Sequence, residues 1–261
     1  MMQKSDEAKE PTENAPMRLR VAVSVALTCL AALASTPASA EPRAVIELFT
    51  SQGCSSCPAA DRLLAEYARD SSVIALSLAV DYWDYLGWKD TLALNGHTKR
   101  QRAYAQARGD REVYTPQVVV DGVAHALGSD KVAIEKAIRK IRDERAPLSL
   151  PVTMTQNGGT LTVTVPSSAD GSGQAEVWLC PITKSVHVTI GRGENSGHTL
   201  TYSNVVRRWI KLGDWSGKAE TFTVPVKDIR SANVDGAAVV VQNGLASAPK
   251  LIVGAAQLGL Q

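Results

Sequence analysis

The stretch Phe49-Thr-Ser-Gln-Gly-Cys-Ser-Ser-Cys-Pro58 decides the fold prediction, because it joins an apolar segment to a helical pattern through two cysteines. The apolar segment, residues 44–50, is typical of a buried strand. Apolar residues then recur at helical spacing over residues 57–67, and the proline suits a first helical turn, where a missing N–H costs little. The sequence therefore places Cys54 and Cys57 between a strand and the start of a helix.

The spacing of the two cysteines predicts redox chemistry. Two thiols separated by two residues can close a small disulfide ring. At a helix start, the first thiol lies near unpaired N–H groups and the positive end of the helix dipole. These groups stabilise a thiolate, so Cys54 is the predicted nucleophile. Cys57, one turn along, is the predicted resolving thiol, which closes the ring and releases a bound partner.

Other interpretations of the pair compete with this one. A purely structural disulfide is an ordinary feature of exported proteins. A zinc site needs about four ligands, and copper is less favoured because no Met or His flanks the pair. We predict no metal ion and no other cofactor. The further thiol and imidazole groups that a metal would need are scattered along the chain: Cys180, His97, His125, His187 and His198.

The first forty residues have the three parts of a secretory signal peptide. A basic patch at residues 17–20 precedes a largely apolar run, 21–34, and Ala38-Ser-Ala40 ends the segment. The alternative is a transmembrane anchor, but the run is shorter than the roughly 20 residues that span a bilayer. We predict a signal peptide over 1–40, with Met17 as an alternative start, and a periplasmic or secreted product without a membrane segment.

Residues 41–146 alternate strands with helices, which indicates an α/β domain. Asp121-Gly122 between two apolar segments is a hairpin signature, and Gly109 is expected to end a helix. Ser129 or Asp130 is expected to cap another helix. Strands are predicted at 44–50, 73–80, 117–120 and 123–127, and helices at 57–67, 98–108 and 131–141.

The pattern changes at Pro147, where charged residues become scarcer and short alternating segments separated by turn residues begin. Such a pattern favours a β-rich, sandwich-like domain over residues 147–261. Strands are predicted at 152–155, 161–165, 176–179, 186–190, 205–212, 220–226 and 237–241.

Charge and composition exclude several classes of protein. The chain has 261 residues and a formal net charge of +2, too small to indicate a nucleic-acid-binding surface. Its 19 glycines and 12 prolines are too few for a collagen or a low-complexity chain. We therefore expect a globular protein whose partner is not chosen by bulk electrostatics.

A proline further along the chain bears on the choice between the interpretations of the cysteine pair. Pro116 lies in Tyr114-Thr-Pro-Gln117, directly before a predicted strand, and with the cysteine pair it resembles the thioredoxin superfamily. That resemblance implies a cis bond between Thr115 and Pro116, against the trans base rate, and a Thr115 backbone that pairs with an incoming substrate chain. It also implies a buried acid, here Glu47, that accepts a proton from the resolving cysteine. The alternative for Glu47 is an ordinary strand-edge carboxylate.

Longer stretches of sequence resemble one particular family. The stretch 49–58 and Val80-Asp-Tyr-Trp-Asp-Tyr-Leu-Gly-Trp-Lys-Asp90 resemble the secreted DUF1223 family, and Gly191-Arg-Gly-Glu-Asn195 and Tyr202-Ser-Asn-Val-Val206 extend the resemblance into the second half. The family implies a thioredoxin-like fold but brings no established substrate. The chain departs from well-characterised thioredoxins by a Ser-Ser pair between the cysteines and by having no Trp before Cys54.

Four other features of the sequence bear on the site. The aromatic residues between 82 and 88 are either a recognition surface or a core, with the core favoured. Lys99, Arg100, Arg102 and Arg108 are expected to form a solvated helix face. Cys180 is expected to be a buried, inert strand cysteine, with a third redox thiol as the alternative. Glu194 and Asn195 lie in a glycine-rich loop, which we interpret as a turn rather than a functional loop.

Two functions follow from these observations. The first is an exported thiol–disulfide oxidoreductase that uses Cys54 and Cys57 to exchange disulfides with protein thiols or disulfides. The second is a non-enzymatic binding module on a thioredoxin-like scaffold, in which the Cys54–Cys57 disulfide is structural.

Overall fold

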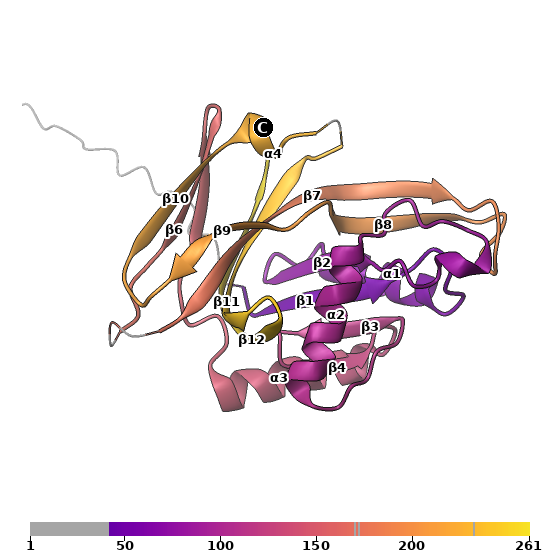
Figure 1. The fold of residues 1–261 in the computed structure, drawn as a ribbon, viewed down its shortest axis with the longest axis horizontal. Helices are drawn as coiled ribbons and strands as arrows, with labels where there is room; N and C mark the ends of the chain where they lie inside the picture. The colour runs from indigo at the N-terminus through magenta and orange to yellow at the C-terminus, as the bar shows by residue number, and fades with distance from the viewer. Residues whose placement is uncertain (1–41, 170, 172, 232) are drawn as a thin grey trace, which may run out of the picture. The chain divides into compact units, whose positions relative to one another are not determined.

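The computed structural model describes residues 42–169, 171, 173–231 and 233–261 (Figure 1). The predicted signal peptide lies outside these residues. The described chain has a mixed α/β fold, with a large mixed sheet, a smaller sheet and few helices. No helix among the described residues is both long and apolar enough to span a bilayer.

The first strand, β1 (Ala44–Thr50), lies in the interior of the large sheet, and all seven of its residues are buried. It pairs in parallel with β2 (Val73–Ala79) and antiparallel with β3 (Gln117–Val120). A hairpin then leads to β4 (Ala124–Leu127). Its turn residues Asp121 and Gly122 have φ values of 47° and 77°. This is the left-handed conformation that a turn of the kind predicted from Asp-Gly requires.

Three helices cover the two faces of this region. The helices α1 (Cys57–Tyr67) and α3 (Lys131–Arg145) pack on the face that carries Ile46 and Leu48. The helix α2 (Asn95–Arg108) contributes Tyr104 to the opposite face. The helix α1 has the predicted bounds, whereas α2 begins three residues earlier than predicted and α3 extends four residues further.

The second half is built around one long strand, β7 (Ala175–Thr189). One side of β7 pairs with β11 (Gly236–Leu245), which continues to β12 (Ala248–Gly259). The other side pairs with β9 (Ile210–Trp215) along its first part and with β8 (Thr199–Val206) along its second part.

This arrangement corrects three strand predictions. The predicted strands 176–179 and 186–190 are one strand, because β7 continues through Pro181. The predicted strand 205–212 is two strands, because β8 and β9 pair with different parts of β7. The strand β12 was not predicted from the sequence.

The large sheet crosses the predicted domain boundary. Its order is β12-β11-β7-β8-β2-β1-β3-β4, with β9 beside β7. The junction between β2 and β8 consists of one register pair, Ser77 with Val205. Strands from residues 41–146 and from residues 147–261 thus belong to one sheet. That the two ranges are separate domains stays a prediction.

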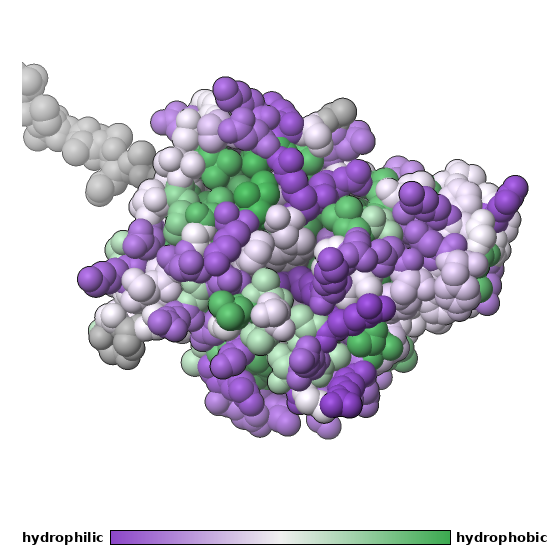
Figure 2. Space-filling model, in the orientation of Figure 1, coloured by the Kyte–Doolittle hydropathy of each residue, from purple (hydrophilic) through white to green (hydrophobic). Residues whose placement is uncertain are grey.

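A smaller antiparallel sheet contains β5 (Thr153–Asn157), β6 (Thr160–Val165) and β10 (Glu220–Pro225), and a short helix, α4 (Val226–Ile229), follows β10. Residues of β6 such as Val163 share an apolar cluster with Leu179 of β7 and Val239 of β11. In Figure 2, polar residues cover much of the visible face, and an apolar area is visible below α4.

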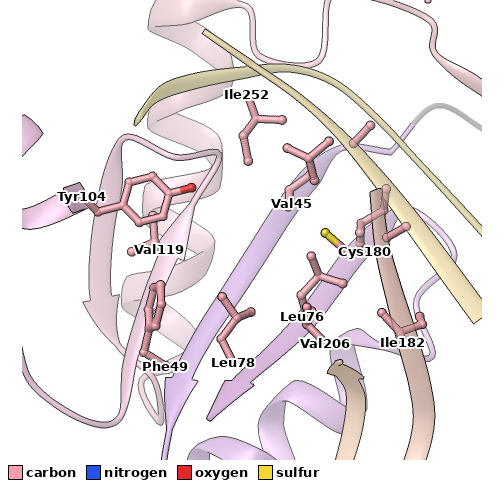
Figure 3. Packing of buried hydrophobic residues seen from close by; sticks show 14 of the residues in the cluster. Val45, Phe49, Leu76, Leu78, Tyr104, Val119, Cys180, Ile182, Val206 and Ile252 are labelled. Carbon is pink, nitrogen blue, oxygen red and sulfur yellow. The ribbon is translucent and has the colours of Figure 1, made fainter. Parts of the chain in front are cut away.

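A second apolar cluster joins the two halves (Figure 3). Val45 and Phe49 of β1 lie in the same cluster as Cys180 of β7, Val206 of β8 and Ile252 of β12. One core therefore draws on strands from both halves and holds β1 against β7, β8 and β12.

Candidate functional site

The predicted cysteine pair forms a disulfide in the structure. Cys54 and Cys57 are bonded, with their Cα atoms 5.4 Å apart. The N–H of Cys54 donates to the carbonyl of Ser51, and the N–H of Cys57 donates to the carbonyl of Cys54, each at 3.2 Å. These turns lead the chain from β1 directly into α1, whose first residue is Cys57.

Both disulfide cysteines are shielded from solvent. Cys54 is 1% exposed and Cys57 is 0% exposed, whereas the intervening Ser55 and Ser56 are exposed. The hydroxyl of Ser56 lies 3.4 Å from Sγ of Cys54. An attacking group therefore reaches Cys54 only where neighbouring segments give way.

The bond between Thr115 and Pro116 is cis, as the resemblance to thioredoxins implied. It directly precedes β3, and Trp83 connects it to the cysteine loop. The indole N–H of Trp83 donates to the hydroxyl of Thr115 at 2.8 Å. A Cβ added at Gly53 would lie 3.1 Å from the Cβ of Trp83, so this side chain lies against the residue before Cys54.

The aromatic residues between β2 and α2 divide between the two predicted roles. Tyr82 and Trp83 pack against the core, in agreement with the favoured interpretation. Tyr85, in the short 3-10 helix η1 (Asp84–Leu86), is 79% exposed. Trp88 is half-buried and donates its indole N–H to Oε1 of Gln52 at 2.8 Å.

Two buried polar side chains hold the cysteine loop. Asp90 accepts a hydrogen bond from the N–H of Gln52 at 2.8 Å. Asn195, in the loop between β7 and β8, donates to the carbonyls of Gln52 and Cys54, both at 2.9 Å. Asn195 was predicted to lie in a simple turn, and its contact with the cysteine loop was missed because it comes from a segment about 140 residues away in sequence.

Glu47 is fully buried but lies on the opposite face of β1 from Ile46 and Leu48. Arg100 of α2 donates to its carboxylate through Nε at 2.6 Å and Nη2 at 3.1 Å, and the hydroxyl of Tyr104 also donates to it. Glu47 is therefore a paired carboxylate rather than a free proton acceptor.

Arg100 was predicted to lie on a solvated helix face, but it is buried. It also donates to Oε1 of Gln242 at 2.9 Å, and its guanidinium lies 4.1 Å from the ring centroid of Trp209. The basic run around Arg100 concealed this role, since Lys99 and Arg102 on either side are exposed, as predicted.

A different carboxyl group lies near the cysteines. Asp61 is four residues after Cys57 on α1, which places the two on the same face of the helix, with Cβ atoms about 5–6 Å apart. Asp61 is 3% exposed, and among the described residues no ion pair holds its carboxyl; the hydroxyl of Thr50 favours its charged form, but burial opposes that form more strongly. Burial raises the pKa of Asp61 to about 8. This carboxyl is therefore largely protonated at neutral pH.

Two hydroxyl groups share this surrounding. Thr50 ends β1 and Tyr202 lies in β8, and both are buried. The hydroxyl of Thr50 lowers the pKa of Asp61 by hydrogen bonding, whereas the hydroxyl of Tyr202 has no hydrogen-bond partner among the described residues. The pKa of Tyr202 is raised by burial and by the neighbouring carboxyl groups of Asp61 and Asp90. The role of Asp61 was not predicted from the sequence, because one acid in an amphipathic helix looks like part of its solvated face.

Cys180 is the remaining described cysteine, and it lies fully buried in the cluster shared by both halves. Burial raises the pKa of its thiol well above the ordinary value. This position agrees with the predicted inert strand cysteine. The described residues contain no group of three or more His, Cys, Asp or Glu side chains placed to hold a metal ion.

Comparisons with known proteins agree with the sequence resemblance. A crystal structure of a protein from Agrobacterium tumefaciens matches with 34% sequence identity and a TM-score of 0.75, covering 84% of this chain and 94% of that one. HBP35 of Porphyromonas gingivalis matches with 16% identity and a TM-score of 0.52, covering 84% and 76% of the two chains, and shows the fold alone. No curated protein matches significantly.

A protein-family model described as "Protein of unknown function (DUF1223)" matches residues 45–242. The matched range contains the cysteine pair, the cis-proline, Asp61 and the loop with Asn195. The chain belongs to the DUF1223 family.

Proposed function

We propose that this chain is an exported thiol–disulfide oxidoreductase that exchanges its Cys54–Cys57 disulfide with protein thiols or disulfides. The observation that carries the proposal is the buried carboxyl of Asp61, one helical turn after Cys57, which forms no ion pair among the described residues. A disulfide that only fastens a loop needs no proton-transferring group beside it, whereas one that opens and closes gains from a group that gives and takes back a proton.

The arrangement of strands supports a thioredoxin-like scaffold for this activity. The order β2-β1-β3-β4, with β2 parallel and β3 antiparallel to β1, places the cysteine pair at the end of an interior strand. The cis bond at Pro116 comes directly before β3. The carbonyl of Pro116 accepts a hydrogen bond from the N–H of Gly128 at 2.9 Å, which fixes the loop that would meet a substrate chain.

In the proposed reaction, the thiolate of an incoming cysteine attacks Sγ of Cys54. A bond forms between these two sulfurs as the Cys54–Cys57 bond breaks, and the electron pair of the broken bond passes to Sγ of Cys57. Asp61, which is largely protonated at neutral pH, gives its proton to the departing thiolate. A second substrate thiolate then attacks the substrate sulfur of the mixed disulfide. A bond forms between the two substrate sulfurs as their bond to Cys54 breaks, and the electron pair of the broken bond passes to Sγ of Cys54. The substrate leaves as a disulfide, and the cysteine pair is left reduced.

Asp61 takes the proton-transfer role that the resemblance assigned to Glu47. Arg100 and Tyr104 occupy the carboxylate of Glu47, so a proton added there would break an ion pair. Asp61 has no such competing partner among the described residues. The localisation stays with the signal peptide predicted over residues 1–40, which implies a periplasmic or secreted site of action.

The alternative is a binding module with a structural disulfide, and the burial of both cysteines favours it. The reduction potential separates the two functions. A structural disulfide is expected below about −300 mV, and an exchanging one above that value.

The direct test is the dithiothreitol-driven reduction of insulin, in which dithiothreitol first reduces the Cys54–Cys57 disulfide and the resulting dithiol then reduces insulin and returns to the disulfide. We expect Cys54→Ser to abolish the catalysed rate and Cys180→Ser to retain it, since Cys180 is buried in the core. Equal rates for Cys54→Ser and the unchanged chain would contradict the proposed function.

A further inference from the structure

The loop between β7 and β8 is hydrogen-bonded to the backbone around the cysteine that the proposed reaction attacks. This loop, residues 191–197, is called the cap here. We propose that the cap makes Cys54 selective for cysteines on short, flexible peptide segments over cysteines on folded protein surfaces. The proposal rests on the exchange reaction proposed above and adds the class of substrate.

Asn195 is the residue that fastens the cap to the cysteine loop. It is 6% exposed, and its side-chain amide donates to two backbone carbonyls, those of Gln52 and Cys54. The carboxylate of Glu194 accepts a hydrogen bond from the N–H of Ser55 at 3.3 Å. The cap therefore contacts the residues on both sides of Cys54 as well as Cys54 itself.

The aromatic residue Trp88 supports the cap from behind. A Cβ added at Gly191 would lie 3.0 Å from the ring of Trp88, so the cap backbone lies against this side chain. Trp88 in turn donates to Gln52, the same residue whose carbonyl Asn195 holds. Gly193 and Gly197, with φ values of 82° and 81°, give the cap the left-handed turns that its path requires.

Because Cys54 is buried, the contacts of the cap limit which substrates can reach it. An attacking sulfur must approach Sγ of Cys54 to bonding distance, and Cys54 is 1% exposed while the cap is in place. Breaking the two Asn195 hydrogen bonds is a local opening, which needs less free energy than unfolding of the chain. A small opening admits one extended chain, whereas a folded surface needs the whole loop displaced.

The test compares two dithiol reductants on the oxidised full chain. One is a synthetic peptide of about nine residues with two cysteines, and the other is reduced thioredoxin, a folded protein; each reduces the Cys54–Cys57 disulfide and becomes a disulfide itself. Rates are followed by acid quenching and mass spectrometry for the unchanged chain, Asn195→Ala, Glu194→Ala and the control Asn157→Ala. Asn157 is exposed at the end of β5, far in sequence from the cap.

We expect Asn195→Ala to raise the thioredoxin rate about tenfold and the peptide rate less than about threefold, because only the large reductant needs the full opening. Glu194→Ala should change the ratio of the two rates in the same direction by a smaller factor, and Asn157→Ala should leave it unchanged. Because each reductant is compared with itself across variants, its intrinsic reactivity cancels.

An unchanged ratio in Asn195→Ala, with exchange still taking place, would overturn the cap and leave the oxidoreductase function standing. Equal acceleration of both reductants would overturn it too, because Asn195 would then only position the disulfide. Failure of both dithiols to reduce any variant would instead contradict the oxidoreductase function. Circular dichroism and urea unfolding check that Asn195→Ala is folded, and Glu194→Ala provides the same comparison at an exposed position.

Discussion

The two faces of β1 treat buried polar groups in opposite ways. On the face toward α2, Glu47 is bonded by Arg100 and Tyr104, and Gln242 completes the group. Toward α1, Asp61 has no ion-pair partner among the described residues, and the hydroxyl of Thr50 is the neighbouring side chain that favours its charged form most. One strand thus separates a group whose charges are fully paired from one whose polar atoms are left open.

The difference suits the Glu47 group to a structural role and the Asp61 carboxyl to proton transfer. A buried ion pair with several hydrogen bonds holds its charges in place and gives little freedom for a proton to move. A buried carboxyl without partners is kept neutral by its surroundings and exchanges a proton when a neighbouring charge appears. The cysteine pair lies at the start of α1, on the open side.

The largest expected effect comes from breaking the paired face. Arg100→Met leaves the Glu47 carboxylate buried without its ion-pair partner, and we expect the free energy of unfolding to fall by about 3–5 kcal/mol. Urea unfolding of the oxidised chain measures it. Lys99→Met, at the exposed neighbouring position, should change stability by less than about 0.5 kcal/mol. A loss below about 1 kcal/mol for Arg100→Met would show that the pair is not structural.

The open face is tested through its pH dependence. Asp61 has its pKa raised from 3.8 to about 8 in the folded chain, so between these values the folded chain binds a proton that the unfolded chain has lost. Stability from this group is therefore present at low pH and is lost as the pH rises toward 8.

We expect the stability of the unchanged chain relative to Asp61→Asn to fall by about 2–3 kcal/mol between pH 5 and pH 7. Urea unfolding at the two pH values measures it. Asp121, whose pKa burial raises to about 7, gives the same slope in both proteins and cancels. Asp143→Asn, on the exposed side of α3, is the control. A difference that is flat with pH would mean that Asp61 is ionised in the folded chain.

A third experiment removes one hydroxyl from the paired face. Tyr104→Phe takes away the group that donates to Glu47 and accepts from Gln242. The bonds from Arg100 to Glu47 remain, so we expect a smaller loss of about 1–2 kcal/mol in the free energy of unfolding. No loss would mean that the two faces do not differ in how tightly their polar groups are held.

The smallest effect is expected for the matching tyrosine near the open face. The hydroxyl of Tyr202 is buried and has no hydrogen-bond partner among the described residues. Tyr202→Phe should therefore leave the free energy of unfolding within about 0.5 kcal/mol of the unchanged chain, or raise it. A loss as large as that of Tyr104→Phe, in the same urea experiment, would remove the distinction between the two hydroxyls.

The local parts of the site were predictable from the sequence. The bounds of β1 and α1 follow from apolar spacing around the cysteine pair, and the disulfide follows from its position between them. The N-cap residue of α3 was also among the predictions. Asp130, one of the two candidates, accepts a hydrogen bond from the N–H of Ala133 at 2.9 Å. Each of these signals lies within a few residues of the feature that it predicts.

The other parts depend on contacts that no local pattern contains. Arg100 and Tyr104 lie one turn apart on α2, but the buried face of that helix is polar, so hydrophobic periodicity could not find it. The roles of Asn195 and Gln242 depend on how β7, β8 and β11 are placed beside the first half. Strand β12 was missed because its glycines and alanines give a weak strand signal.

The single register pair between Ser77 and Val205 bears on how the chain could be divided for use as a tool. Two fragments separated at residues 146 and 147 would share almost no strand ladder. They would share an apolar face, since Val45 and Phe49 of the first fragment pack in one cluster with Ile182 and Ile252 of the second. Such fragments would recognise each other by their side chains rather than by backbone pairing, which is the property required of a split-protein reporter.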